Sequence, residues 1–337
     1  MTPATNEVRK PLRMVCCSGC DAKVFIPGDL TPLSTTPCTK CGHPVMMPMR
    51  MRQFDLRDAI ASGGMGTVYR AVDLMLEREV AVKLMRKELV EDAKSLESFY
   101  REARACAALN HTNIIHIYTF DEFDGQLYLV MELADRGSLD HKIEQQGRLS
   151  ELQVLDIGIK VADALDTALK HSLLHRDIKP GNILFNADGE PKLVDFGLAR
   201  STEADAEYES AVWGTPYYIA PEKVKRERED FLSDMYSLAG TLYHALTGHV
   251  PFEAPTVEEV VAAHIHTPLT PPGHVDREIT QPTSDALVIA MAKSPAERYR
   301  SYNDFRMAME ASRSQLLIGQ LRAKKETGAV GRSWWRR

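Results

Sequence analysis

The chain has 337 residues, of which 44% are hydrophobic and 26% are charged, so it can form one large core and a small satellite domain. Its formal net charge of −6 disfavours broad nucleic-acid binding. No apolar stretch approaches the roughly 20 residues of a membrane span, and the N-terminus lacks the basic and apolar segments of a signal peptide. We therefore expect a cytoplasmic protein without a transmembrane segment.

Five of the six cysteines lie before residue 42, which indicates a metal site in a reducing compartment rather than a disulfide framework. Four of them form two Cys-x-x-Cys pairs with 17 residues between the pairs: Cys17, Cys20, Cys38 and Cys41. This spacing is typical of a zinc ribbon, in which each pair binds tetrahedral Zn²⁺ from a tight turn. We predict a zinc-ribbon-like domain over residues 1–50 with structural Zn²⁺, in which Cys16 is a spare thiol and His43 a less favoured substitute ligand.

Residues 50–53 are predicted to be a short linker, followed over residues 54–73 by two strands around a glycine-rich turn. Glycines there would let backbone N–H groups approach phosphate oxygens that side chains would otherwise block. The residues of this turn and its flank are Ala61, Ser62, Gly63, Gly64, Met65, Gly66 and Val68. The pattern is weak by itself, because many hairpins contain several glycines.

The next segment, residues 79–84, alternates like a strand and places Lys83 among apolar residues. A lysine in such a position needs an anionic partner. The helix predicted over residues 95–109 supplies a candidate in Glu102, which lies among small residues.

Two polar segments follow in apolar surroundings. Asp177, Lys179 and Asn182 lie within residues 173–184, and Asp195 follows a short apolar strand. Carboxylates packed close together repel one another unless a cation lies between them. Oxygen ligands of this kind suit Mg²⁺, which takes its remaining ligands from water and phosphates.

Taken in order, these segments resemble a bacterial eukaryotic-type (Hanks-type) serine/threonine protein kinase over residues 54–313. The resemblance rests on the glycine turn and five further motifs: Val80-Ala81-Val82-Lys83, Glu102, His175-Arg176-Asp177 through Asn182, Asp195-Phe196-Gly197 and Ala220-Pro221-Glu222. It implies an α+β, bilobal protein-kinase fold, with a β-rich N-lobe, a helical C-lobe and ATP between them.

The resemblance also implies a role for each site residue. Lys83, paired with Glu102, would hold the α- and β-phosphates beneath the glycine turn, in which Ala61 replaces the first glycine of the family. Asp177 would accept or orient the proton of the attacking hydroxyl, and Lys179 would approach the γ-phosphate. Asn182 and Asp195 would bind Mg²⁺ (or Mn²⁺). The adenine would contact the hinge residues Met131, Glu132 and Leu133. The apolar residues Val68, Ala81 and Leu184 would enclose the base.

Further positions are expected to be structural or regulatory. The family likeness suggests a buried Glu222–Arg298 pair and an Asp234 side chain that caps the backbone of the catalytic loop. In the activation segment we expect Ser210 to be autophosphorylated. Arg176 and Arg200 would bind the added phosphate, unless the acidic residues around Ser210 already take its place.

The C-terminal segment, residues 314–337, is expected to form a basic tail. Residues 316–337 carry six Lys or Arg against one acid and end in two tryptophans beside two arginines. Such an end could dock on an acidic partner or a membrane interface, but we expect a disordered tail.

The expected function is therefore a serine/threonine protein kinase that uses ATP and Mg²⁺, with protein substrates and a homodimer for autophosphorylation in trans. The alternative is a pseudokinase scaffold with a zinc-ribbon adaptor. The enzyme is favoured because Lys83, Glu102, Asp177, Asn182 and Asp195 are all present. A nucleic-acid-binding ribbon is disfavoured, because the ribbon has few basic or aromatic residues. Since no catalytic motif lies within residues 1–50, we expect activity on a generic peptide to survive their deletion.

Overall fold

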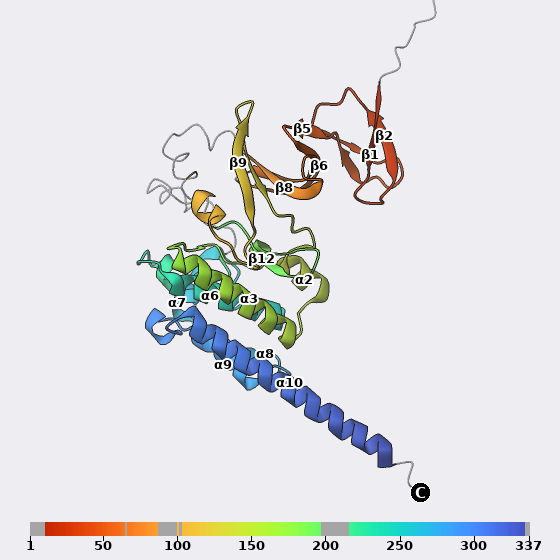
Figure 1. The fold of residues 1–337 in the computed structure, drawn as a ribbon. Helices are drawn as coiled ribbons and strands as arrows, with labels where there is room; N and C mark the ends of the chain where they lie inside the picture. The colour runs from red at the N-terminus through yellow and green to blue at the C-terminus, as the bar shows by residue number, and fades with distance from the viewer. Residues whose placement is uncertain (1–10, 65, 87–99, 101–102, 197–215, 334–337) are drawn as a thin grey trace, which may run out of the picture. The chain divides into compact units, whose positions relative to one another are not determined.

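The protein comprises two compact units, shown in Figure 1. The computed structural model describes residues 11–64, 66–86, 100, 103–196 and 216–333, with side chains up to residue 322. The first unit, residues 1–97 and 117–133, is rich in strands, and we call it the strand-rich unit. The second, residues 98–116 and 134–337, contains most of the helices, and we call it the helical unit. The expected division into a β-rich and a helical lobe is confirmed.

The strand-rich unit begins with two short antiparallel hairpins. β1 (Leu12–Cys16) pairs with β2 (Lys23–Pro27), and β3 (Thr35–Pro37) pairs with β4 (Pro44–Met46). Each hairpin carries one Cys-x-x-Cys pair in its turn. Together they enclose a small core whose buried members are Cys17, Val24, Ile26, Cys38, Val45 and Met47. We call this part, residues 11–47, the ribbon.

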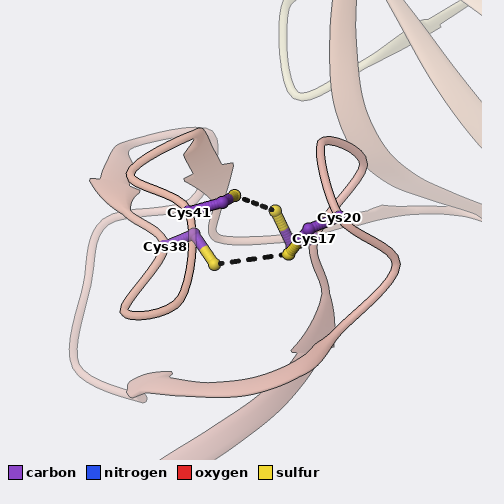
Figure 2. A group of neighbouring side chains, drawn as sticks. All are labelled: Cys17, Cys20, Cys38 and Cys41. Carbon is purple, nitrogen blue, oxygen red and sulfur yellow. Dashed lines mark hydrogen bonds between the residues drawn. The ribbon is translucent and has the colours of Figure 1, made fainter.

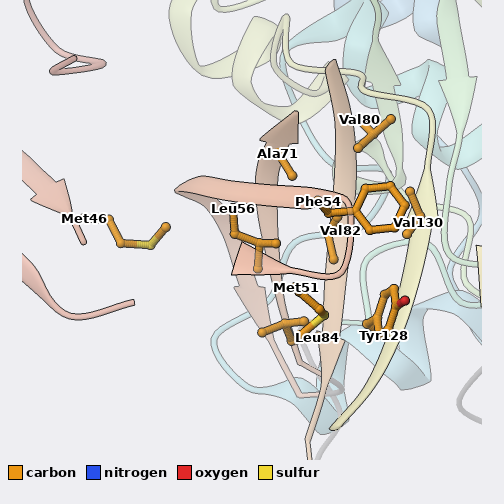
Figure 3. Close-up of a cluster of buried hydrophobic side chains, with 10 residues drawn as sticks. All are labelled: Met46, Met51, Phe54, Leu56, Ala71, Val80, Val82, Leu84, Tyr128 and Val130. Carbon is orange, nitrogen blue, oxygen red and sulfur yellow. The ribbon is translucent and has the colours of Figure 1, made fainter. Parts of the chain in front are cut away.

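The rest of this unit is a six-stranded antiparallel sheet in the order β5-β6-β7-β8-β10-β9. Its strands are β5 (Met49–Met51), β6 (Phe54–Gly63), β7 (Gly66–Asp73), β8 (Arg78–Met85), β9 (Ile117–Phe123) and β10 (Gln126–Met131). The two strands predicted around the glycine turn are β6 and β7, and the strand predicted to carry Lys83 is β8, so these predictions are confirmed. One face of the sheet carries the hydrophobic cluster of Figure 3.

The predicted linker at residues 50–53 is wrong. Met49–Met51 forms strand β5, in which Met49 lies opposite Leu56 and Met51 opposite Phe54. A turn at Arg52, with φ of +51°, then leads into β6. A strand of three residues is too short to show a periodic pattern, and its pairing depends on a partner strand that local sequence does not reveal.

The helical unit is built on helices whose ends are marked by capping residues. α3 (Glu151–Lys170) begins with a capping box between Ser150 and Gln153. α6 (Phe231–Thr247) begins at the Asp230 cap and ends at Gly248, whose φ of +76° favours glycine. Besides helical residues 103–107, the described part of this unit contains α2 (Leu139–Gln146), α5 (Pro221–Val224), α7 (Val257–His266), α8 (Pro272–Val275), α9 (Gln281–Ala290) and α10 (Tyr302–Ser333), with short 3₁₀ turns η2 (Pro180–Asn182) and η4 (Pro295–Glu297).

The expectation of a disordered tail is wrong for residues 316–333, because these residues continue helix α10. Extending an existing helix avoids the cost of nucleation, and residues 315–325 are mostly strong helix formers. The terminal tryptophans and arginines, residues 334–337, lie outside the described residues. In the part of the chain that the structure describes, no helix has the length and apolar character needed to cross a lipid bilayer.

Candidate active site and metal centre

A short hairpin in the helical unit brings the two polar segments together. β11 (Ile183–Phe185) pairs with β12 (Pro191–Leu193), and Ile183 lies opposite Leu193. The backbone N–H of Val194 donates to the carbonyl oxygen of Asn182 at 3.0 Å. Asn182 and Asp195 therefore lie at the same end of this hairpin, although 13 positions separate them in sequence.

Asp177 is the centre of a hydrogen-bonded group. Its Oδ2 accepts from Lys179 Nζ at 2.8 Å and from Asn182 Nδ2 at 3.0 Å. The Asn182 amide nitrogen also donates to the Asp177 carbonyl oxygen at 2.7 Å, which leaves its Oδ1 as the atom available to a cation. Since 46% of the Asp177 side chain is exposed, the carboxylate is held in place yet remains open to a substrate.

The backbone that precedes Asp177 is held by a buried carboxylate, as predicted. Asp234 Oδ2 accepts from the N–H of His175, and its Oδ1 accepts from the N–H of Arg176, both at 2.7 Å. Burial raises the pKa of Asp234, although the hydrogen bonds from these two N–H groups act to lower it. One side chain near the start of α6 thus fixes two consecutive peptide groups of the loop.

His175 connects this loop to the strand before Asp195. Its Nε2 lies 2.9 Å from the Val194 carbonyl oxygen, and its Nδ1 accepts from the N–H of Asp177 at 3.3 Å. Both bonds are satisfied by the neutral ring with its proton on Nε2. Complete burial lowers the pKa of His175 and favours that neutral form. The ring also packs against Phe196, with a centroid distance of 4.7 Å.

Two residues of this site adopt a backbone conformation that is uncommon for side chains other than glycine. Arg176 has φ of +65° and Asp195 has φ of +57°. Lys223 supports the first, because its Nζ donates to the Arg176 carbonyl oxygen at 2.9 Å. Sequence reasoning missed this contact. The only available signal was that Lys223 directly follows the Ala-Pro-Glu motif.

The strand-rich unit contains most of the other predicted site residues. Lys83 lies on β8 opposite Val68 of β7 and Leu129 of β10, and only 5% of it is exposed. At the glycine turn, a Cβ on Gly66 would collide with the carbonyl oxygen of Leu84, so close backbone packing requires glycine there. Further residues of the predicted nucleotide site lie on β6, on β8 and at or just after the end of β10: Ala61, Ser62, Gly63, Ala81, Met131, Glu132 and Leu133.

Leu184 lies on β11 of the helical unit, and Gly64 lies between β6 and β7. Four predicted residues lie outside the described part of the chain: Met65, Glu102, Arg200 and Ser210. Residues 103–107, which follow Glu102, are helical as predicted. Cys106, the one cysteine outside the ribbon, is buried as a small apolar residue.

The ribbon gathers the four predicted metal ligands into one cluster (Figure 2). Their sulfur atoms lie within 4.8 Å of one another, and two of the separations are 3.6 Å between Cys17 and Cys41 and 4.0 Å between Cys20 and Cys38. Four thiolates around a zinc ion at 2.3 Å would lie about 3.8 Å apart in a tetrahedron. The geometry of the cluster therefore fits such an ion.

The pKa values of these thiols also favour a bound metal ion. The backbone N–H groups of Lys40 and Cys41 lower the pKa of Cys38 to about 6. For Cys41 the N–H of His43 acts likewise, but the neighbouring thiols and burial outweigh it and raise the pKa to about 12. Four adjacent sulfurs cannot all ionise without a cation, whereas a divalent metal would hold all four as thiolates.

Comparison with known proteins gives one family. A family model described as "Protein kinase domain" matches residues 54–310. The chain is 37% identical over 268 residues to the serine/threonine-protein kinase PknA of Mycobacterium tuberculosis, a match that covers 78% of this chain and 62% of PknA.

Two other relatives are similar at the same level. The chain is 36% identical over 262 residues to the serine/threonine-protein kinase PknB of Mycolicibacterium smegmatis, covering 75% of this chain and 42% of PknB. It is 34% identical over 250 residues to a probable serine/threonine-protein kinase of Clostridium perfringens, covering 74% of this chain and 36% of that protein. The matched region thus makes up between about a third and two thirds of each relative.

Proposed function

The chain belongs to the protein kinase family, and from this premise we propose that it is an active kinase that phosphorylates serine and threonine residues of proteins. The relatives named as serine/threonine kinases support that specificity. The observation that carries the proposal is the group formed by Asp177, Lys179 and Asn182, in which a half-exposed carboxylate is held by two donors. A scaffold that performs no chemistry has no need of this arrangement.

In the proposed reaction, a serine or threonine hydroxyl attacks the γ-phosphorus of ATP while the bond from that phosphorus to the β-phosphate oxygen breaks. ADP is released, and the hydroxyl proton passes toward Asp177, whose carboxylate orients the attacking oxygen. Lys179, ion-paired to Asp177 at 2.8 Å, would place its ammonium group near the transferred phosphoryl charge.

Asn182 and Asp195 are proposed to hold Mg²⁺, or Mn²⁺ in its place. The donors fit, because an amide oxygen and a carboxylate at one end of the β11–β12 hairpin are hard oxygen ligands. When bound, the ion would offset the negative charge of the phosphates. Lys83 is proposed to bind the α- and β-phosphates, with Glu102 as its partner. The glycine turn would approach the phosphates through its backbone N–H groups.

The adenine is proposed to lie against Met131, Glu132 and Leu133, with Val68, Ala81 and Leu184 as apolar neighbours. Val68 and Ala81 lie on the adjacent strands β7 and β8. The hinge residues lie at or just after the end of β10, where backbone groups no longer needed by the sheet could read the base.

The cysteine cluster is proposed to bind one structural Zn²⁺. Its four-sulfur composition excludes hard cations such as Mg²⁺, and its separations fit tetrahedral coordination. We further propose three regions: a ribbon domain at residues 1–50, a kinase domain at residues 54–313 and a basic C-terminal segment at residues 314–337. The clustering of five of the six cysteines before residue 42, in a metal-binding pattern, also supports a reducing, cytoplasmic location.

Phosphoamino-acid analysis tests the proposal. Purified protein incubated with γ-labelled ATP, Mg²⁺ and a generic protein substrate should yield phosphoserine and phosphothreonine. Lys83→Met should abolish the label, and Arg86→Met, which changes an exposed cation just beyond the same strand, should not. Wild-type protein should also label an inactive Asp195→Asn copy, as expected for a homodimer that acts in trans. Nucleotide binding without phosphotransfer would instead support the scaffold.

A further inference from the structure

Strand β4 of the ribbon contributes side chains to two different cores. Val45 of β4 and Met47, the first residue after the strand, are buried in the ribbon core together with Cys38. Met46, between them, is buried in the hydrophobic cluster of the six-stranded sheet, where Figure 3 shows it pointing toward the residues of the other strands. Consecutive side chains of a strand point to opposite faces, so this single strand forms part of both cores.

Strand β5 extends the same connection. Met51 is fully buried in the sheet cluster, and Met49 packs against that cluster from the edge of the sheet. Leu33, which precedes β3, also packs there. Its N–H donates to the Met47 carbonyl oxygen at 2.9 Å, so the ribbon backbone orients a side chain that covers the sheet.

The turn after β5 fixes this edge to the opposite edge strand. Arg52 donates to the Glu122 carbonyl oxygen of β9 at 3.0 Å and forms an ion pair with Asp121 at 3.2 Å. Because β5 and β9 are the two edge strands of the sheet, this contact links the turn that follows one edge strand to the other edge strand. The ribbon is thus joined to the sheet by a shared strand, a paired strand and a closing turn.

The cysteine cluster lies directly next to this junction. Cys38 follows β3, and Cys41 lies three residues before β4. Few large apolar groups support the ribbon core, so a bound metal would supply much of what holds β3 and β4 together. If the ribbon loosened, Met46, Met49 and Leu33 would lose their fixed positions over the sheet, and β6 would lose the strand at its edge. β6 leads directly into the glycine turn.

We propose that metal bound by the ribbon controls the order of β6 and of the glycine turn, so that loss of the metal weakens nucleotide binding. The ribbon is then a regulatory part of the strand-rich unit, so deletion of residues 1–50 should lower the affinity for nucleotide even though no catalytic motif lies within them. The inference rests on the proposed zinc site, but it does not depend on phosphotransfer.

Hydrogen–deuterium exchange on the full-length protein, without nucleotide, tests this inference. The protein would be compared as loaded with Zn²⁺, after removal of the metal by a chelator, and after Zn²⁺ is added back. We expect removal to increase amide exchange at least about tenfold in both the ribbon and β6, with recovery on re-addition. Peptides of α10 serve as an internal reference. The affinity for a fluorescent ADP analogue should fall several-fold in the stripped protein.

Two variants separate the metal site from its coupling to the sheet. Met46→Ala should retain one Zn²⁺ per chain yet increase exchange in β6, because it removes the shared side chain and no ligand. Cys16→Ser, which changes an exposed thiol outside the cluster, should behave as the wild type. Faster exchange in the ribbon with unchanged β6 and unchanged ADP affinity would overturn the coupling. Absence of bound Zn²⁺, with no change in the ribbon on chelation, would overturn the metal site itself.

Discussion

Arg298 and Glu222 form a buried ion pair with two parallel hydrogen bonds. Nη1 lies 2.7 Å from Oε1, and Nη2 lies 2.8 Å from Oε2. Ser233 Oγ also donates to Oε1 at 2.7 Å. The pair expected from the sequence is therefore confirmed, and it joins α5 to the segment that follows η4.

Replacing Arg298 with alanine should destabilise the protein strongly. The substitution leaves the Glu222 carboxylate buried without its cation, a change that typically costs about 3–5 kcal/mol. Urea unfolding followed by circular dichroism measures this effect. Arg300→Ala, two residues away and exposed, should change the unfolding free energy little. Equal shifts for the two variants would contradict the importance of the pair.

The same pair should contribute to stability in a pH-dependent way. Burial favours the neutral acid, but the hydrogen bonds and charge of Arg298 outweigh it and hold the pKa of Glu222 below its ordinary value. The contribution is therefore fully present above the ordinary glutamate pKa of about 4.3, and it is lost as the pH falls through the lowered value. The difference in unfolding free energy between wild type and Glu222→Gln should therefore shrink as the pH falls below about 4.3. A difference that stays constant from neutral pH into that range would contradict this.

Much of the site was predictable from sequence, because its residues are set by chemistry at fixed spacings. The two Cys-x-x-Cys pairs, the hairpin around Gly63 and Gly66, and the polar loop through Asp177 have local signatures. Strand β5 has none. Its three residues become a strand only by pairing with β6. Which of the two cores contains the Met46 side chain is likewise decided by tertiary packing and not by local sequence. The basic charge of residues 316–333 does not predict their structure, whereas their helix propensity and the preceding helix favour the extension of α10.

Asp234 should affect catalysis by positioning the loop before Asp177. Asp234→Ala removes the acceptor of two backbone N–H groups, so it should lower kcat by about 10-fold or more with a smaller change in the KM for ATP. Asp234→Asn retains one acceptor oxygen, so its kcat should lie between that of the wild type and that of Asp234→Ala. Steady-state kinetics measure both, and thermal unfolding separates misfolding from mispositioning. Variants that fold and have wild-type kcat would contradict this role.

Phosphorylation of Ser210 should activate the enzyme. A phosphate adds a charge of about −1.5 to −2, which Arg176, exposed beside Asp177, could bind together with Arg200. Ser210→Ala should lower activity several-fold, and Arg176→Ala should remove the dependence on residue 210. Mass spectrometry of the active protein, combined with rates for both variants, measures this. Full activity with Ser210 unmodified would contradict this prediction and would show that the acidic residues around Ser210 take the place of a phosphate.

The central claim, that the chain is a kinase in which Asp177 orients the attacking hydroxyl, is tested most directly by the initial rate of γ-phosphate transfer in Asp177→Asn. Asparagine preserves the size of the side chain and removes the carboxylate that Lys179 and Asn182 hold. The rate should fall by about 10²–10⁴-fold, while the affinity for Mg·ADP stays within about twofold of the wild type. A variant that transfers phosphate at the wild-type rate would contradict the claim.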